Sequence, residues 1–182
     1  MKTFITSDTH WGHTNIIKFC TDTRSHFTDV DHMNSEMIRM WNEIVEPDDL
    51  VYHLGDVAFC QASQATKIMN SLNGRKILVK GNHDSKLVKD AGFRGCFEEI
   101  HDYLEVNYNG QKLVMCHYPI FDHNQAGRGS IMLHGHRHGN PHNIPGRIMD
   151  VGFDSTKSMV TNLDDIVLKM QNVTHMYHHD NK

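Results

Sequence analysis

Histidines and aspartates gather at five places along this chain, in patterns that could bind metal ions. The 182 residues include 16 histidines. The five places are Asp8-Thr9-His10, Gly55-Asp56, Gly81-Asn82-His83-Asp84, His117 and Gly135-His136-Arg137-His138-Gly139. A folded core cannot hold so many imidazoles and carboxylates without partners, because buried polar and charged groups are costly when unpaired. Metal ions are the partners that best explain this mixture of ligands.

Most of these places have an ordinary structural explanation when each is taken alone. Asp8-Thr9-His10 is typical of a helix start, and Gly55-Asp56 is typical of a turn. Gly81-Asn82-His83-Asp84 is equally typical of a turn between a strand and a helix, and His117 of the end of a strand. The histidine pair between Gly135 and Gly139 is harder to explain by packing. The five places together favour a metal-binding or catalytic role over a purely structural one.

Each place follows a short apolar run that the residue pattern predicts as a strand. These runs are Phe4-Ile5-Thr6, Leu50 to Leu54, Ile77-Leu78-Val79, Lys112 to Cys116 and Ile131-Met132-Leu133. In open α/β sheets, ligands bind beyond the carboxyl ends of strands. If these strands are neighbours, we expect the five places to converge on one rim.

The remaining pattern predicts an α/β fold with mixed sheets. Apolar residues from Val30 to Ile44 recur at helical spacing, and Pro47 follows them; Ala62 to Leu72 forms a second such helix, closed by Asn73-Gly74. Asn109-Gly110 indicates a hairpin between Tyr103–Tyr108 and Lys112–Cys116. A further strand is expected from Ile148 to Val151, and Asn162 is expected to cap a helix from Leu163 to Met170.

Composition indicates a single domain over residues 1–182 in a cytoplasmic setting. The apolar fraction is 38% and the charged fraction 22%, as in ordinary soluble proteins. No apolar run approaches the roughly 20 residues that cross a bilayer, so we expect no membrane partner. The net charge of −4 argues mildly against nucleic acid binding. The four cysteines are expected to be reduced, with Cys116 in the core.

At the motif level the chain resembles the calcineurin-like metallophosphoesterase family. The family pattern is Asp-x-His, Gly-Asp, Gly-Asn-His-Asp or -Glu, His, and Gly-His-x-His, and every element is present here in order between residues 8 and 138. The flanks Asp8–Ile17 and Val51–Asp56 are similar to those of small, cap-free bacterial and phage members. Asp150-Val151-Gly152-Phe153-Asp154 resembles an element of that subgroup that usually begins with Asn, so Asp150 departs from the pattern.

The resemblance implies a four-layer α/β/β/α sandwich of two mixed sheets, with the metal site at the C-terminal ends of strands. It also implies two divalent metal ions that share Asp56. Asp8, His10 and His138 would complete the first site, and Asn82, His117 and His136 the second. Ligands without a thiolate favour Mn²⁺, with Fe, Zn²⁺ or Ni²⁺ as alternatives. If the segment is extended, His136 and His138 point to the same side.

The implied activity is hydrolysis of phosphodiesters, nucleotide-type ones included, or of phosphomonoesters. A metal-activated hydroxide would attack phosphorus, and His83 would act as general acid. Asp84 would orient His83 or a metal-bound group. The alternatives are a nuclease of the same chemistry and a non-catalytic scaffold on the same fold. A small phosphoester substrate in an open site is favoured over nucleic acid, and the oligomeric state stays open.

Several other polar residues carry weaker expectations. His13 and Asn15 could contact substrate, but each is equally typical of a surface loop. Arg128 could contact a phosphate, but a solvated loop arginine is the favoured interpretation. His53 is predicted to be a core histidine with a hydrogen-bond partner. His175, His178 and His179 lie in the C-terminal tail, where adventitious metal binding is the most that we expect.

Overall fold

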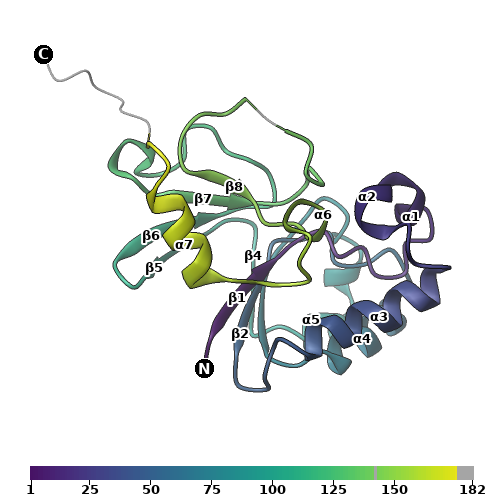
Figure 1. The fold of residues 1–182 in the computed structure, drawn as a ribbon. Coiled ribbons are helices and arrows are strands. Elements are labelled where there is room, and N and C mark those ends of the chain that lie inside the picture. The colour runs from purple at the N-terminus through teal and green to yellow at the C-terminus, as the bar shows by residue number, and fades with distance from the viewer. Residues whose placement is uncertain (142, 176–182) are drawn as a thin grey trace, which may run out of the picture.

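In the computed structural model, which describes residues 1–141 and 143–175, two mixed sheets lie face to face (Figure 1). The first sheet has the order β4-β3-β2-β1-β9, and the second has the order β5-β6-β7-β8. The first sheet contains β1 (Thr3–Thr6), β2 (Leu50–His53), β3 (Arg75–Val79), β4 (Glu99–His101) and β9 (Thr161–Asn162). The second contains β5 (Leu104–Tyr108), β6 (Gln111–Met115), β7 (Ile131–His134) and β8 (Ile148–Asp150). The α/β class with two mixed sheets is confirmed.

Most strand pairs are parallel, so their carboxyl ends meet at one rim of the sandwich. β1, β2, β3 and β4 run parallel to one another, and only the edge strand β9 pairs antiparallel with β1. β6, β7 and β8 are also parallel, while β5 pairs antiparallel with β6. The turn between β5 and β6 is made by Asn109 and Gly110, with φ values of 51° and 84°. Both are left-handed, as a two-residue hairpin of this twist requires.

Helices pack mainly against the outer face of the first sheet. They are α1 (Ile16–Phe19), α2 (Thr21–Arg24), α3 (Val30–Asn42), α4 (Ala62–Ser71), α5 (Ala91–Arg94), α6 (Phe153–Thr156) and α7 (Leu163–Gln171), with 3₁₀ helices η1 (Leu87–Lys89) and η2 (Ala126–Arg128). Asn162 caps α7 by accepting a hydrogen bond from the Asp164 amide at 2.8 Å, as predicted. α3 ends at Asn42, before Pro47, and the Asn42 side chain bonds to the backbone of Ser71 and Asn73 at the end of α4.

The core follows the alternation of side chains along the strands. Phe4, Val51 and Leu78 face the helices and pack with Trp41 of α3. Their neighbours Ile5, Tyr52 and Ile77 face inward, where they meet Leu113, Ile131 and Leu133 of the second sheet and Leu163 and Ile166 of α7. The outer face of the second sheet is covered by Ile120 and Ile144 from connecting segments. This last layer is therefore built from loops in the described part of the chain, whereas helices form the layer over the first sheet.

The four cysteines are all free thiols. Cys116 lies just beyond β6, where it is half-buried and packs against the cluster of Val114, Met132 and Ile148, so it lies at the edge of the core. Among the described residues, no helix is both long enough and apolar enough to cross a membrane.

Candidate metal centre and active site

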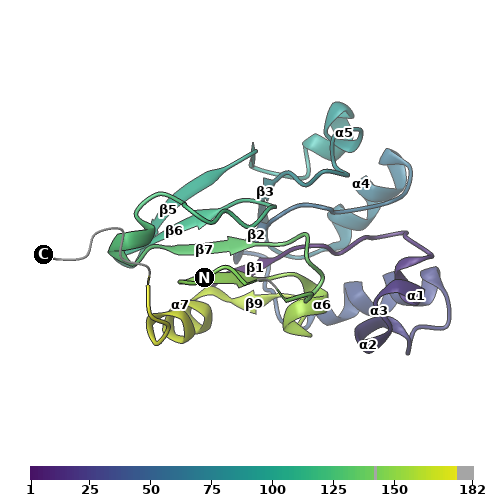
Figure 2. The same cartoon turned by 90° about the horizontal axis from the view of Figure 1, so that it is seen from above.

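The five polar places meet at the rim formed by the carboxyl ends of β1, β2, β3, β6 and β7 (Figure 2). The Nε2 atom of His10, from the β1 loop, lies 3.8 Å from Asp56 Oδ2 in the β2 loop. His117 Nε2, after β6, lies 3.6 Å from the same oxygen. His138 Nε2, after β7, lies 3.8 Å from Asp8 Oδ1. These atoms are too far apart for hydrogen bonds, but their spacing suits ligands placed about 2.0–2.2 Å from a shared cation.

Each of the two aspartates divides its oxygens between the backbone and the site. Asp8 Oδ2 accepts a hydrogen bond from the His136 amide at 2.8 Å, while Asp8 Oδ1 faces His10 and His138 at 3.8 Å. Asp56 Oδ1 accepts a hydrogen bond from the His83 amide at 3.0 Å, while Asp56 Oδ2 faces His10 and His117. Each carboxylate thus fastens one loop and turns a single oxygen toward the imidazoles.

Two of the imidazoles have their tautomer set by the partner of the other ring nitrogen. His117 Nδ1 lies 2.8 Å from the Leu54 carbonyl oxygen, and His138 Nδ1 lies 2.8 Å from Asp154 Oδ2. Both partners accept hydrogen bonds, so each Nδ1 must carry a proton. That arrangement leaves Nε2 of each ring to act toward the centre, in the manner of metal-binding histidines.

Several polar atoms at the centre are buried without a hydrogen-bond partner among the described residues. They are Asp8 Oδ1 and both ring nitrogens of His10. An unpartnered buried polar atom costs about 1–3 kcal/mol. Asp8 Oδ1 and His10 Nε2 lie 3.8 Å apart, and each lies 3.8 Å from a further ligand atom, His138 Nε2 and Asp56 Oδ2 respectively. The donor set contains carboxylates and imidazoles, which suits a divalent transition metal. The residues present therefore fit a metal ion.

The charges at the centre stabilise one another. Burial alone would raise the pKa of Asp8, but the nearby imidazoles of His10, His117 and His138 lower it. Burial lowers the pKa of His10, which favours the neutral ring that a metal requires. Burial opposes the charge on His138 as well, yet Asp154 raises the pKa of that ring to about 10. A ring made this basic is a strong ligand once a cation displaces its proton.

The backbone at the centre is held in an unusual conformation. Asp8, His10, Asp56, His136 and His138 all have positive φ values, between 49° and 71°. Such conformations are uncommon for residues other than glycine and collect where function requires them. The segment from His136 to His138 is therefore not extended, and that prediction is wrong. Two left-handed residues, rather than strand alternation, turn both imidazoles toward the centre while the Arg137 side chain bonds to the Pro141 carbonyl.

The residues of the centre lie within a stretch of chain that matches a known protein family. The family model for the calcineurin-like phosphoesterase superfamily domain matches residues 1–151. The chain belongs to the calcineurin-like phosphoesterase superfamily. It is accordingly a hydrolase that acts on phosphoester bonds, and its family is metal-dependent.

Similar proteins come from archaea, phages and bacteria. The uncharacterised protein MJ1445 of Methanocaldococcus jannaschii is 35% identical over 141 residues, which is 76% of this chain and 70% of that protein. The gene 66 protein of Mycobacterium phage L5 is 25% identical over 190 residues, or 88% and 90% of the two chains. The crystal structure of AQ665 from Aquifex aeolicus, a protein of unknown function, has a TM-score of 0.71 at 24% identity, covering 92% of this chain and 98% of that one. This last likeness shows the fold.

In this phosphoesterase, Asn82 and His136 lie beside His117. Asn82 Oδ1 is 3.0 Å from His117 Nε2, so it stands at the same side of Asp56 as that imidazole. The His136 ring packs edge-on against the His117 ring with centroids 5.1 Å apart, and it also contacts Tyr118. Both residues therefore belong to the group around His117, at its more exposed edge.

His83 stands at the mouth of the centre. Its side chain is 48% exposed, and its Nε2 lies 3.9 Å from Asp56 Oδ2. The imidazole packs against Phe59 with ring centroids 4.5 Å apart, and the same phenyl ring stacks on His10 and His13. Phe59, which the sequence analysis did not single out, thus limits where the His83 ring can lie.

Asp84 is buried beneath the centre and does not contact His83 through its side chain. Its Oδ2 accepts hydrogen bonds from the amides of Asp56 and Gly81 at 2.9 and 2.8 Å, and its Oδ1 accepts one from Val57 at 2.9 Å. The carboxylate therefore ties the β2 loop to the β3 loop. Gly81 allows this close approach, since a Cβ there would lie 2.2 Å from Asp56 Oδ1.

Arg24 and Asp154 form a buried ion pair behind His138 that sequence reasoning missed. The Arg24 guanidinium donates to Asp154 from Nε at 2.8 Å and from Nη2 at 2.9 Å, and it also donates to the carbonyls of Asp8 and Thr9. Burial would raise the pKa of Asp154, but the hydrogen bonds from His138 and Arg24 lower it well below its usual range. One buried arginine thus supports the Asp8 loop and the carboxylate that holds His138.

Replacing Asp154 with asparagine should destabilise the fold strongly. The Asp154→Asn variant would leave the fully buried Arg24 charge without its counter-ion, and breaking a buried pair in this way costs about 3–5 kcal/mol. The free energy of unfolding, measured with urea, tests this. Glu98→Gln is the matched control because it breaks the exposed Arg75–Glu98 pair, which should cost less than about 1 kcal/mol. Equal losses in the two variants would contradict the assigned role of the buried pair.

The remaining polar residues lie in various places. His53 is buried and bonded to Thr9 and the Gly55 amide, as predicted for a core histidine. His13 packs beside the centre, against His10 and Phe59. Arg128 lies in η2, before the start of β7 and thus at the opposite end of that strand from the centre, so a phosphate contact there is not supported. His178 and His179 lie outside the described residues.

Proposed function

We propose that this protein is a dinuclear metal-dependent phosphoesterase. Asp56 Oδ2 carries the proposal, because this single oxygen faces His10 on one side and His117 on the other. Asp8 Oδ1, His10 and His138 would hold the first ion. Asn82, His117 and His136 would hold the second, and Asp56 would contribute to both. Mn²⁺ is the ion that we favour for this set of ligands, since it contains no thiolate.

Bound metal ions would supply an activated water and positive charge opposite the phosphoryl oxygens. The chain's own residues divide the other tasks. His83 donates a proton from its ring to the leaving oxygen, because it is exposed at the mouth of the centre and a poor leaving group needs that proton. The Phe59 ring holds the imidazole of His83 in place. Asp84 acts as a positioning residue by fixing the loop that carries Asp56.

The substrate class that we favour is a small phosphoester, either a diester or a monoester. The rim is open around His83 and Asn82, both of which are exposed. The overall charge of −4 supports a small substrate over a nucleic acid polymer. The presence of His83 supports catalysis over a scaffold role, which does not need a proton donor at this position.

Metal removal and return test the proposal. We expect chelator-treated protein to hydrolyse bis(p-nitrophenyl) phosphate and p-nitrophenyl phosphate no faster than buffer does. Addition of Mn²⁺ should restore hydrolysis of at least one ester, with two ions per chain by elemental analysis, because both ligand groups are present. A folded protein that takes up no ion would refute the metal centre. A protein that holds two ions and hydrolyses neither ester would refute the activity.

A further inference from the structure

Two hollows open on different sides of the centre. The first, named here the His83 hollow, has a volume of about 650 Å³ and is lined by Asn82 and His83 together with Phe59, Gln64 and Lys86. The second, named the His138 hollow, has a volume of about 380 Å³ and is lined by His138 and Asp154. Its lining also includes Phe19, Asn140, Ser155 and Lys157. Both volumes fall in the range of about 300–1,000 Å³ typical of small-molecule sites.

The centre lies between the two hollows. The His83 hollow is bounded by the start of α4 and by η1, whereas the His138 hollow is bounded by α1, α2 and α6. Figure 2 shows α4 on one side of the ends of β1, β2 and β3, and α2 and α6 on the other side. The His10 ring stands between them, with its centroid 4.8 Å from that of His138 and 6.3 Å from that of His83. The two hollows therefore adjoin the centre at different residues, one at His83 and the other at His138.

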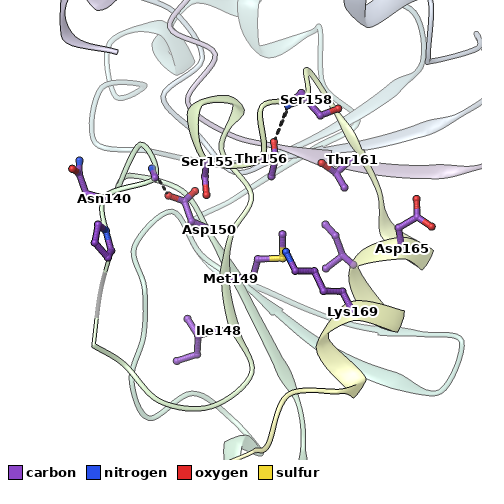
Figure 3. A pocket seen from close by; sticks show the side chains of 13 residues that line it. Asn140, Ile148, Met149, Asp150, Ser155, Thr156, Ser158, Thr161, Asp165 and Lys169 are labelled. Atoms are coloured by element: carbon purple, nitrogen blue, oxygen red, sulfur yellow. Dashed lines mark hydrogen bonds between the residues drawn. The ribbon is translucent and has the colours of Figure 1, made fainter. Parts of the chain in front are cut away.

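The His138 hollow shares part of its wall with a larger one. Gly139, Asn140 and Ser155 line both, and the larger hollow has a volume of about 540 Å³. Figure 3 shows Asp150, Thr161 and Lys169 around this space, between β8 and α7. Asp150 Oδ2 accepts a hydrogen bond from the Gly139 amide at 3.1 Å, which holds the wall next to His138.

The two hollows offer similar chemistry. Each has one phenylalanine, Phe59 in the first and Phe19 in the second, and Phe19 is 71% exposed. Each also has amide or hydroxyl side chains, such as Gln64 and Ser155. Each contains a single lysine, Lys86 or Lys157, among its described lining residues, and the His138 hollow also has the carboxylates of Asp22 and Asp154, which would repel a further phosphate. An aromatic face with neutral polar groups suits an uncharged ring-bearing arm, such as a nucleoside, better than a further phosphate.

We infer that the preferred substrate is a phosphodiester with two ring-bearing arms, one in each hollow. This inference rests on the proposed function. The arm that leaves would occupy the His83 hollow, because the proton donor lines it. The arm that stays on phosphorus would occupy the His138 hollow. A monoester has one arm and would leave the His138 hollow unused, so the arrangement favours diesters.

Three esters separate the contributions of the arms. Methyl p-nitrophenyl phosphate has no ring on the arm that stays, a nucleoside 5′-(p-nitrophenyl phosphate) has one, and a dinucleoside monophosphate has a nucleoside on both sides. We expect the Mn²⁺-loaded wild type to prefer the nucleoside ester over the methyl ester by about tenfold in kcat/KM. Ser155→Phe, which fills the His138 hollow, should reduce that ratio to near one. Gln64→Trp, which narrows the His83 hollow, should lower kcat/KM for the dinucleoside about tenfold relative to the methyl ester.

The ratio of the kcat/KM values for two substrates, measured on one sample, does not depend on what fraction of a variant is folded. Leu168→Trp and Ser63→Trp are the matched controls, because both positions are exposed and line neither hollow; their ratios should equal the wild-type ratios. Calorimetry with a non-hydrolysable methylphosphonate dinucleoside should show weaker binding to Ser155→Phe and Gln64→Trp than to the controls. A wild-type ratio near one, or hollow variants that match the controls, would overturn the inference and leave the proposed function standing. A wild type that holds metal but hydrolyses none of the esters would overturn both.

Discussion

The Asp56→Asn variant is expected to lose both metal ions and, with them, nearly all hydrolysis. Asp56 Oδ1 accepts the His83 amide hydrogen, so asparagine would keep its carbonyl oxygen there and turn its NH₂ group toward the centre. The NH₂ group would take the place of Asp56 Oδ2, which lies 3.8 Å from His10 Nε2 and 3.6 Å from His117 Nε2. An amide NH₂ cannot bind a cation. Because removing groups that merely support a ligand weakens metal affinity about 10–100-fold, we expect a loss of more than about 100-fold here.

Elemental analysis and a Mn²⁺ titration would measure this loss for both ions in one experiment. Asp102→Asn is the matched control, since Asp102 is highly exposed, pairs with Lys80 and is not among the proposed ligands. It should bind two ions with the wild-type affinity. If Asp56→Asn lost only one ion and kept the other at wild-type affinity, the proposed role of Asp56 in holding both ions would be wrong.

The His83→Ala variant is expected to keep both ions but to lose rate in proportion to how poor the leaving group is. Its backbone amide remains, so the hydrogen bond to Asp56 Oδ1 is retained and the metal ligands stay in place. The ring that would protonate the leaving oxygen is removed. A positioned general acid contributes about 10²–10⁴-fold, so a dinucleoside monophosphate, which expels an alkoxide, should slow by that factor. A p-nitrophenyl ester, whose phenoxide leaves without a proton, should slow far less.

Measurement of kcat for both kinds of ester, beside the metal content, distinguishes this role from a structural one. His26→Ala serves as the control because His26 is exposed and lies outside the centre; it should leave both rates unchanged. An equal loss for good and poor leaving groups would show that His83 does not act as a proton donor. Loss of a metal ion would show that its ring is a ligand instead.

Much of the architecture could be predicted from the sequence because the signals are local. The Asn109-Gly110 hairpin and the Asn162 cap each depend on residues within a few positions, and both occur where the sequence places them. The strand-end positions of the five polar places also follow from short apolar runs. Their order along the chain was enough to indicate the family.

Only the tertiary structure decided how the centre is built. Arg24 reads as an ordinary charged residue in Thr21-Asp22-Thr23-Arg24, yet it is fully buried against Asp154, 130 positions away. The use of one oxygen by Asp8 and one by Asp56, and the left-handed backbone from His136 to His138, likewise depend on loops from separate strands. Short sequence patterns report preferences among near neighbours, whereas these contacts are made by segments that only the sheet topology brings together. The sequence by itself therefore determined which residues are proposed to carry the chemistry, and the packing of the two sheets decided which of their atoms face one another.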